Sequence, residues 1–342
     1  MRDAVTLRSY LTDWCRDEAM KASAAAAIEA IAAAAAIIAA RIAKGPLEGH
    51  LGAKLGGNAD GDTQTKLDVW ANDQIIAALR GAQVAVVASE ELQAPLTIEA
   101  GAPIAVAIDP LDGSSNIDTN VSVGTIFALL PAKGEATFLQ PGSAQIAAGY
   151  VIYGPQCAMV LTVGEGTQRF TLDPETRDFL LTGWNVTISP DTKEFAINAS
   201  NYRHWSDNVR AYVDDCLAGV DGPRVIDFNM RWIASLVAEC HRILARGGIF
   251  LYPRDARKGY QKGRLRLIYE ASPIAFIVEQ AGGKAFDGFT RILDIAPEKL
   301  HQRTPLIFGS ANEIDRIACY KADPNNSFER SPLFGRRGLL RI

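Results

Sequence analysis

Histidine and cysteine are both scarce in this chain of 342 residues, with four and five copies respectively. The histidines are dispersed, and no two of them stand at the spacing of metal ligands. The cysteines are odd in number and form no close pairs. Zinc sites and disulfide frameworks both need such groupings. The pattern therefore favours reduced thiols and a cytoplasmic location over either kind of cysteine site.

The chain also lacks a large excess of either charge, because it has 35 basic and 39 acidic residues and a net charge of −4. A basic surplus attracts nucleic acids and anionic membranes, and this chain has none. We therefore predict neither a nucleic acid nor a membrane as a partner. Apolar residues make up 48% of the chain, enough for a substantial core, and the length indicates one large or two medium domains.

Long hydrophobic runs are limited to residues 22–43, a segment made mostly of alanine. It lacks the Leu, Val and Phe typical of a membrane span, and it includes Glu29. A charged stretch at residues 16–18 precedes it, which a signal peptide would not have. Its apolar stripe follows helical steps of three and four: Ile28, Ile31, Ala35, Ile38 and Ile42. We predict an amphipathic helix packed in a protein core or a subunit contact.

Apolar periodicity along the rest of the chain indicates a layered α/β protein. In the first half we expect helices within 5–43 and from 66, a long loop over 45–65, strands at 84–88 and 104–108, and a β-rich block over 121–188. In the second half we expect strands at 194–199 and 248–251 and helices over 206–217, 231–244 and 265–281. We predict two domains, residues 1–189 and 190–342.

A cluster of polar residues follows the apolar run at 104–108. Its sequence is Asp109-Pro110-Leu111-Asp112-Gly113-Ser114-Ser115. The two carboxylates stand three residues apart around a rigid proline, so they could share divalent cations. The glycine and the serines after them could offer backbone N–H groups to a phosphate. The alternative is an ordinary solvated turn, because these residue types are common in turns.

The strand at 84–88 also ends in acids, Glu90 and Glu91. If the two strands are neighbours, four carboxylates converge at one edge of a sheet and repel one another unless cations neutralise them. Oxygen ligands alone indicate Mg²⁺ or Mn²⁺ rather than zinc. Alternatively the strands are distant and their acids are solvated.

Three further acids have two interpretations each. Asp62 and Asp68 lie near the junction of the long loop and the next helix, where an acid either caps the helix or takes part in catalysis. Glu270 lies among apolar residues, where a carboxylate is usually paired or bound to a metal. The Arg, Lys and Tyr residues at element ends in the second half suit an anionic substrate or, equally, a solvated face.

These motifs, read together, resemble class I fructose-1,6-bisphosphatases. The matching blocks run through most of the chain, at residues 61–69, 89–91, 109–118, 121–127, 139–142, 147–150, 247–253, 265–270 and 301–303. The short Asp-Pro-Leu-Asp-Gly match alone would admit the whole lithium-sensitive phosphatase superfamily, whereas the longer blocks are specific to this family. The resemblance implies an αβαβα sandwich of two subdomains, assembled as a homotetramer, that hydrolyses the 1-phosphate of fructose 1,6-bisphosphate.

The resemblance also implies roles for individual residues. Two or more Mg²⁺ ions per subunit, for which Mn²⁺ can substitute, would be bound by Glu90, Asp109, the Leu111 carbonyl, Asp112 and Glu270. The attacking water would be oriented and deprotonated by Glu91, Asp68 and Asp62. The reacting phosphate would contact Asp112, Gly113, Ser114, Ser115 and Arg266. The sugar and its other phosphate would contact Asn198, Asn201, Tyr202, Arg231, Trp232, Tyr252 and Arg264.

The chain departs from the animal enzymes of this family at three places. Trp232 replaces a tyrosine and Arg264 replaces a lysine, so a larger sugar bisphosphate, sedoheptulose 1,7-bisphosphate, is the alternative substrate. The positions that contact AMP in the animal enzymes are occupied here by Pro103, Ile104 and Pro131. We therefore predict no AMP inhibition of the animal type. The regulatory cysteine insertion of the plastid form is absent as well, and both a gluconeogenic and a carbon-fixing role stay open.

Overall fold

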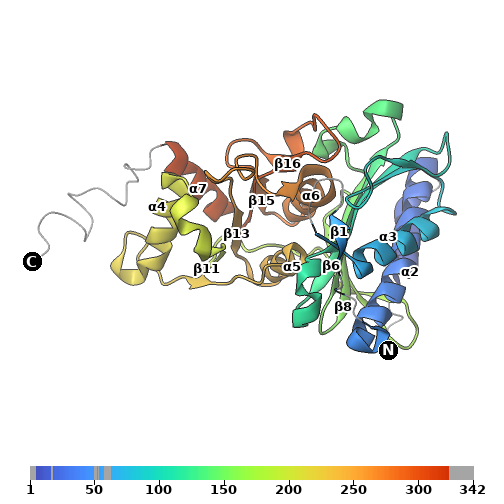
Figure 1. Cartoon of the computed structure of the whole chain (residues 1–342), viewed down its shortest axis with the longest axis horizontal. Helices are drawn as coiled ribbons and strands as arrows, with labels where there is room; N and C mark the ends of the chain where they lie inside the picture. The colour runs from blue at the N-terminus through green and yellow to red at the C-terminus, as the bar shows by residue number, and fades with distance from the viewer. Residues whose placement is uncertain (1–4, 17, 50–51, 53, 58–62, 323–342) are drawn as a thin grey trace, which may run out of the picture.

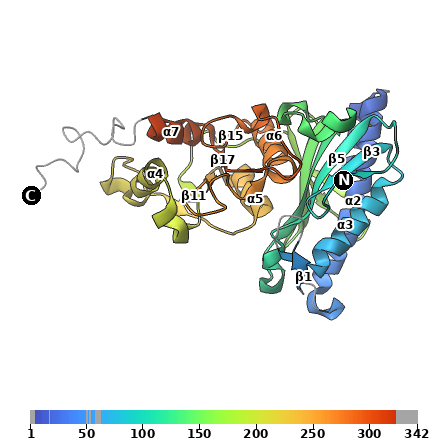
Figure 2. The ribbon, with the colours of Figure 1, turned by 45° about the horizontal axis from the view of Figure 1, so that its top comes forward.

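The computed structural model describes residues 5–16, 18–49, 52, 54–57 and 63–322. Two β-sheets alternate with three layers of helices (Figures 1 and 2). The helices α1, α2 and α3 cover one face of the larger sheet, α5 and α6 lie between the two sheets, and α4 and α7 cover the far face of the smaller sheet. The predicted αβαβα layering is confirmed.

The outer layer of the first half consists of α1 (Leu7–Cys15), α2 (Ala19–Lys44) and α3 (Lys66–Leu79). The stripe predicted on α2 faces the sheet, with Ile28, Ile31 and Ile38 fully buried. By length and composition alone, residues Ala19–Leu47 could cross a membrane, but 56% of the most apolar window is buried inside the protein. This burial favours the predicted packing role for α2.

The larger sheet has the strand order β10-β9-β8-β7-β6-β5-β3-β4. Only β3 and β5 are parallel, and the other neighbours are antiparallel. The strands are β3 (Val84–Ser89), β4 (Leu96–Thr97), β5 (Ile104–Asp112), β6 (Val123–Pro131), β7 (Ala147–Tyr153), β8 (Cys157–Thr162), β9 (Thr167–Leu172) and β10 (Phe179–Gly183). Every residue of β5 is buried, as expected for a strand covered by helices on both faces.

The smaller sheet has the order β12-β11-β13-β17-β15. Its strands are β11 (Glu194–Ala196), β12 (Asn229–Met230), β13 (Ile249–Tyr252), β15 (Lys284–Phe286) and β17 (Leu306–Gly309). The helices around it are α4 (Asp207–Leu217), α5 (Leu236–Arg246), α6 (Ser272–Gln280) and α7 (Ala311–Ala322). The central helices α5 and α6 pack with both sheets in one apolar cluster, so the two halves share a core. The division into domains at residue 189 stays a prediction.

Short elements complete the described chain. Two small ribbons pair β1 (Lys54–Gly57) with β2 (Thr63–Thr65) and β14 (Leu265–Arg266) with β16 (Arg303–Thr304). The 3-10 turns are η1 (Gly45–Glu48), η2 (Ser114–Thr119), η3 (Gly134–Leu139), η4 (Gly142–Ala144), η5 (Ala199–His204), η6 (Gly219–Asp221) and η8 (Ile292–Asp294). A π-helical turn, η7 (Leu267–Ala271), leads directly into α6.

Four predictions of local structure were wrong. The segment predicted as a long loop over 45–65 contains η1 and the paired strands β1 and β2 among its described residues. The helix predicted over 231–244 begins at Leu236, because residues 231–235 have no regular structure and include Ala234 at φ 61°. The helix predicted over 265–281 begins instead as β14 and the π turn. The strand predicted over 194–199 ends at Ala196, because Asn198 caps η5.

Candidate metal and phosphate site

The parallel strands β3 and β5 bring two acidic strand ends together. Ser89 pairs with Ile108, so Glu90 follows one strand where Asp109 continues the other. The turn η7 packs beside β5 and adds Glu270. Carboxylate oxygens of Glu90, Asp109 and Glu270 lie within 4.8 Å of one another. Two of the four acids expected at this edge, Glu90 and Asp109, are therefore in the cluster, and Glu270 joins them.

Burial and like charge act together on these acids. The pKa values of Asp109 and Glu270 are raised well above their usual range, first by burial and then by the negative charge of Glu90. Such a cluster is unstable while all its carboxylates are charged, and a bound cation offsets both the cost of burial and the mutual repulsion. The donors are all carboxylate oxygens, a set that fits Mg²⁺ or Mn²⁺ and not a thiolate- or imidazole-seeking metal.

Arg266 brings a buried positive charge to the same cluster. Its side chain is 1% exposed, and its Nη2 lies 3.8 Å from Glu90 Oε1. Its backbone N–H donates to the carboxylate of Glu270, which links β14 to the π turn. A guanidinium fixed beside the carboxylates is well placed for a phosphate that binds between cation and arginine.

Asp112 is placed differently from the other predicted metal ligands. Its Oδ2 accepts hydrogen bonds from Val237 N at 3.0 Å and from Ser235 Oγ at 3.3 Å, at the start of α5. Burial raises the pKa of Asp112 to about 6, against the opposing effect of those hydrogen bonds. The pairing register between β5 and β6 shifts between Asp109 and Asp112. Leu111 therefore lies at an irregularity of the strand. The Leu111 N–H donates to Asp109 Oδ1 at 2.9 Å.

The predicted phosphate-binding turn, residues 113–115, comes directly after Asp112 in the chain. Gly113 has φ 75°, a conformation that favours glycine, and precedes η2, where Ser114 and Ser115 are the first residues. A Cβ at position 113 would lie 3.3 Å from the Cβ of Ser235. Conformation and space therefore both favour glycine here, and the N-terminal N–H groups of η2 follow at once.

The residues predicted to act on water lie along the start of α3 and the end of β3. Asp68 forms a capping box with Thr65 and accepts its N–H at 2.6 Å, as in the capping alternative. Burial raises the pKa of Asp68, while hydrogen bonds from Thr65 and Ser114 lower it. Glu91 Oε2 accepts a hydrogen bond from Gln64 Nε2. Asp62 lies outside the described residues.

The residues predicted to bind the rest of the substrate fall into two groups. Trp232 and Tyr252 lie together over Phe250, with Trp232 stacked on it at 5.8 Å between ring centroids. Burial raises the pKa of Tyr252, and the charge of Arg264 opposes the rise. Arg264 also lies over the Tyr260 ring at 4.9 Å. The negative charge of Glu270 adds to the rise in the pKa of Tyr252.

The second group is bound to its own surroundings. Asn198 caps η5 by accepting a hydrogen bond from Ser200 N, and Asn201 N donates to the Asn198 carbonyl. Tyr202 donates its hydroxyl to Asp214 of α4 at 3.0 Å. Arg231 lies 3.6 Å from Glu194. The described contacts of these four side chains are thus separate from the carboxylate cluster.

Sequence reasoning missed the start of α5 as part of the site. Ser235 and Val237 bind Asp112, and Asn116 Nδ2 donates to the Ala234 carbonyl at 2.9 Å. The signal was a serine before an apolar periodic run, which is typical of a helix start. It was hidden because Trp232 and Ile233 extend the same periodicity.

Two family models match almost the whole described chain. The fructose-1-6-bisphosphatase N-terminal domain matches residues 6–183, and the C-terminal domain of the same family matches residues 188–322. The chain belongs to the fructose-1,6-bisphosphatase family. Both models together include every described residue of the carboxylate cluster and of the α5 start.

Class 1 fructose-1,6-bisphosphatases from bacteria are similar over the full chain. The protein of Rhizobium meliloti is 55% identical over 98% of this chain and 99% of its own length. The protein of Rhodopseudomonas palustris is 53% identical over 100% of both chains. The solved fructose-1,6-bisphosphatase of Leishmania major in its holo form superposes with a TM-score of 0.87 at 36% identity, covering 93% of this chain and 99% of that one. This fructose-1,6-bisphosphatase fold is therefore shared beyond bacteria.

Proposed function

We propose that this enzyme hydrolyses the 1-phosphate of D-fructose 1,6-bisphosphate to fructose 6-phosphate and phosphate, with Mg²⁺. Full-length similarity to proteins named class 1 fructose-1,6-bisphosphatase supports the substrate. The observation that carries the chemistry is the cluster of Glu90, Asp109 and Glu270 beside Arg266. Phosphoryl transfer needs charge neutralisation and positioning more than covalent catalysis, and this site supplies both.

We assign the metal-binding role to the carboxylates of Glu90, Asp109, Asp112 and Glu270 and to the Leu111 carbonyl. Two or more Mg²⁺ ions, or Mn²⁺ in their place, would neutralise the phosphate and lower the pKa of a bound water. Asp109 is fixed for this role by its bond from the Leu111 N–H, and Glu270 by its bond from the Arg266 N–H. Each of these carboxylates keeps a further oxygen lone pair for a cation.

Glu91, Asp68 and Asp62 are assigned to the attacking water. Glu91 follows Glu90 directly, and its negative charge adds to the rise in the pKa of Asp109, which supports a place near the bound water. Gln64 and the Ser89 hydroxyl hold Glu91 in place through its carboxylate and its N–H. Proton transfer to a positioned carboxylate is general base catalysis. Asp68 adds a negative charge next to Ser114, at the phosphate-binding turn.

The substrate is proposed to bind at both of its phosphates. The reacting phosphate is assigned to Asp112, Gly113, Ser114, Ser115 and Arg266. The sugar and the second phosphate are assigned to Asn198, Asn201, Tyr202, Arg231, Tyr252 and Arg264. Arg264 offers a fork of hydrogen-bond donors and Trp232 offers a broad apolar face, which supports sedoheptulose 1,7-bisphosphate as a second substrate.

We further propose that the protein is a cytoplasmic homotetramer of two-domain subunits (residues 1–189 and 190–342). It would bind neither nucleic acid nor membrane and would lack AMP inhibition of the animal type.

Phosphate release tests this function. Fructose 1,6-bisphosphate, sedoheptulose 1,7-bisphosphate and inositol 1-phosphate are each supplied with Mg²⁺ and, separately, with EDTA. We expect Mg²⁺-dependent release from fructose 1,6-bisphosphate and no release with EDTA. Preference for inositol 1-phosphate would point to another phosphatase activity, and failure on every substrate would point to a non-catalytic role.

Addition of AMP to the active reaction tests the regulation. Inhibition by AMP in the micromolar range would contradict the proposed lack of an AMP site.

A further inference from the structure

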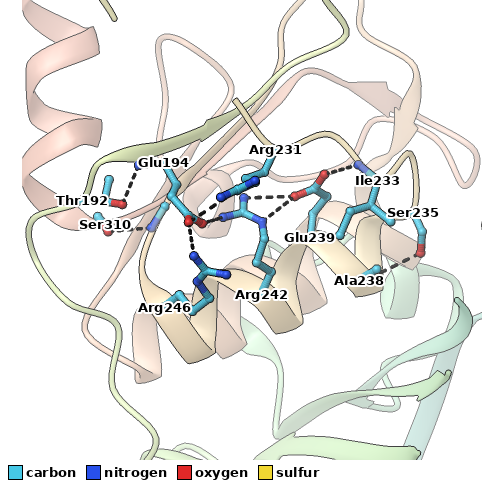
Figure 3. Close-up of polar contacts among 11 residues, drawn as sticks. Thr192, Glu194, Arg231, Ile233, Ser235, Ala238, Glu239, Arg242, Arg246 and Ser310 are labelled. Atoms are coloured by element: carbon cyan, nitrogen blue, oxygen red, sulfur yellow. Dashed lines mark hydrogen bonds and ion pairs between the residues drawn. The ribbon is translucent and has the colours of Figure 1, made fainter. Parts of the chain in front are cut away.

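Five charged side chains form a network along α5 and the segment before it (Figure 3). Glu194 of β11 lies at its centre and interacts with three arginines: Arg231 at 3.6 Å, Arg242 at 2.8 Å, and Arg246. Arg242 also donates to Glu239 on its own helix, from Nε at 3.1 Å and from Nη2 at 3.0 Å. Arg242 thus bridges the two acids, and we call these five residues the acid–arginine cluster.

Burial makes this cluster different from a surface ion pair. The side chain of Glu239 is 0% exposed, and those of Glu194 and Arg242 are 9% and 10% exposed. Surface pairs contribute little, but a buried carboxylate that loses its partner is strongly destabilising. Arg242 is therefore fixed in place by two buried anions. Arg231 and Arg246 are half exposed at the rim.

Glu239 has a second contact that reaches outside the cluster. Its Oε1 accepts the backbone N–H of Ile233 at 2.6 Å. Ile233 belongs to residues 231–235, which we call the connecting segment because it joins β12 to α5. Local preference does not favour its shape, since Ala234 has φ 61°, a left-handed conformation that costs about 1 kcal/mol for a residue with a Cβ. Tertiary contacts must therefore hold the segment.

Four such contacts are present along the connecting segment. Arg231 N donates to the Phe195 carbonyl at 2.7 Å, and Ile233 N donates to Glu239. The Ala234 carbonyl accepts from Asn116, and Ser235 Oγ donates to Asp112. One end of the segment thus carries Arg231, and the other end holds Asp112. Two of these contacts involve a charged side chain, Glu239 and Asp112. Asp112 belongs to the proposed site, whereas Glu239 does not.

We propose that the acid–arginine cluster positions the connecting segment, with Glu239 setting the orientation of Asp112 through Ile233 and Ser235, and Glu194 setting the orientation of Arg231. The inference rests on the proposed function, in which Asp112 binds metal and Arg231 binds an anionic substrate. Glu239 and Glu194 are positioning residues, since their described contacts are with the protein. Both acids bind Arg242, but their other contacts differ, because Glu239 contacts the segment in its middle and Glu194 contacts the Arg231 side chain.

Two substitutions test the two effects. Glu239→Gln keeps an acceptor for the Ile233 N–H but removes the charge that fixes Arg242. We expect the dissociation constant for Mn²⁺, measured by titration calorimetry without substrate, to rise roughly tenfold, as for other residues that orient metal ligands. Glu194→Gln should affect Mn²⁺ binding less than Glu239→Gln does, because Glu239 still binds Arg242 and Ile233, and it should raise KM for fructose 1,6-bisphosphate about two- to fivefold, the scale of a partly exposed ion pair, with kcat unchanged.

Glu279→Gln is the matched control. Glu279 also lies on a helix and pairs with an arginine, Arg291, at 2.6 Å, and the described contacts of this pair do not include the connecting segment. It should change neither Mn²⁺ binding nor KM. If Glu239→Gln does not fold, Arg242→Lys takes its place, because lysine keeps the charge but cannot bridge both acids as a fork. It should also raise the dissociation constant for Mn²⁺.

The results separate this inference from the proposed function. If the wild-type protein binds Mn²⁺ but hydrolyses no sugar bisphosphate, the function is wrong, and calorimetry still tests Glu239. If hydrolysis is normal while Glu239→Gln and Arg242→Lys bind Mn²⁺ as the wild type does, the inference is overturned. A fall in melting temperature with Mn²⁺ binding and KM unchanged would show a purely structural role and would also overturn it.

Discussion

Glu90, Asp109 and Glu270 come from three separate elements and meet in spite of their mutual repulsion. Each is held by backbone geometry, through the paired ends of β3 and β5 and through the π turn η7. The meeting of Glu90 and Asp109 was predictable from acids at the ends of two strands, whereas the place of Glu270 beside them was implied only by the resemblance. The hydrogen-bond partners of the nearby acids were not predictable. Asp112 binds Ser235 and Glu91 binds Gln64, and both partners are ordinary polar residues in the sequence.

Glu91 is the residue whose replacement tests the proposed chemistry most directly. Glu91→Gln keeps the side-chain size but removes the basic oxygen, so we expect kcat to fall by roughly 10²- to 10⁴-fold. Binding of fructose 1,6-bisphosphate should change little, since Glu91 is assigned to the water. Steady-state rates and calorimetric substrate binding measure the two effects. A nearly normal kcat would remove Glu91 from the mechanism.

The raised pKa values of the cluster predict how stability depends on pH. Asp112 has a folded-state pKa of about 6, above the 3.8 of an ordinary aspartate, so the folded state binds the proton more tightly than the unfolded state. Without metal, the free energy of unfolding should therefore rise as the pH falls from about 7 to about 4. Asp109 and Glu270 shift in the same direction.

Thermal melting in EDTA, followed across that pH range, measures the effect. Protons and cations compete for the same carboxylates, so Mg²⁺ should raise the melting temperature most at the upper end of the range. Asp109→Asn should raise the melting temperature of the metal-free protein at pH 7 and weaken the response to Mg²⁺. A metal-free protein that loses stability steadily below pH 7 would contradict this account of the cluster.

At the scale of elements, the turn at Gly113 connects β5 to η2. Gly113→Ala should lose about 1–2 kcal/mol of stability from the left-handed backbone, and it should also raise KM because the new Cβ presses on Ser235. Gly101→Ala is the control, since Gly101 has φ 92° but a Cβ added there would meet no described atom within 4 Å. Chemical denaturation and steady-state kinetics would separate the two effects. Equal KM values in both variants would exclude the contact with Ser235.

Element boundaries were predictable where local signals acted alone. Thr6 and Thr65 form capping boxes, and α1 and α3 begin at the residues that follow them. The signal failed where tertiary contacts act on a helical pattern. Residues 231–235 have apolar spacing that suits a helix, but contacts to Glu239 and Asn116 hold them in another shape. At η7, the Glu270 carboxylate accepts the N–H of Arg266, and the first turn widens to a π turn.

At the scale of the whole molecule, the two sheets share the central helices. Leu236 of α5 and Ile274 of α6 lie in one apolar cluster with Tyr150 of the larger sheet and Phe308 of the smaller one. Strands that are apolar on both faces predicted helices on both sides of a sheet, whereas the order of the five layers was implied only by the resemblance. Which helices fill the middle layer was not predictable, because that depends on contacts between residues far apart in the chain.

The shared core predicts that the first half does not fold by itself. A fragment of residues 1–189 would expose the face of the larger sheet that α5 and α6 cover, where Ile126, Tyr150 and Val160 are buried. An exposed apolar sheet face of this kind leads to aggregation. Expression of the fragment and near-ultraviolet circular dichroism of any soluble part measure this. A soluble, cooperatively unfolding fragment would contradict it.

The three clustered carboxylates lie far apart in the sequence, so they are made at different times during synthesis. Glu90 and Asp109 leave the ribosome with the larger sheet, whereas Glu270 is made long afterwards, with the π turn between the two sheets. Chains are built from the N-terminus at about 5–20 residues per second. A nascent chain therefore lacks one of the three clustered carboxylates for many seconds, and the proposed metal site is complete only after the second half has emerged and docked.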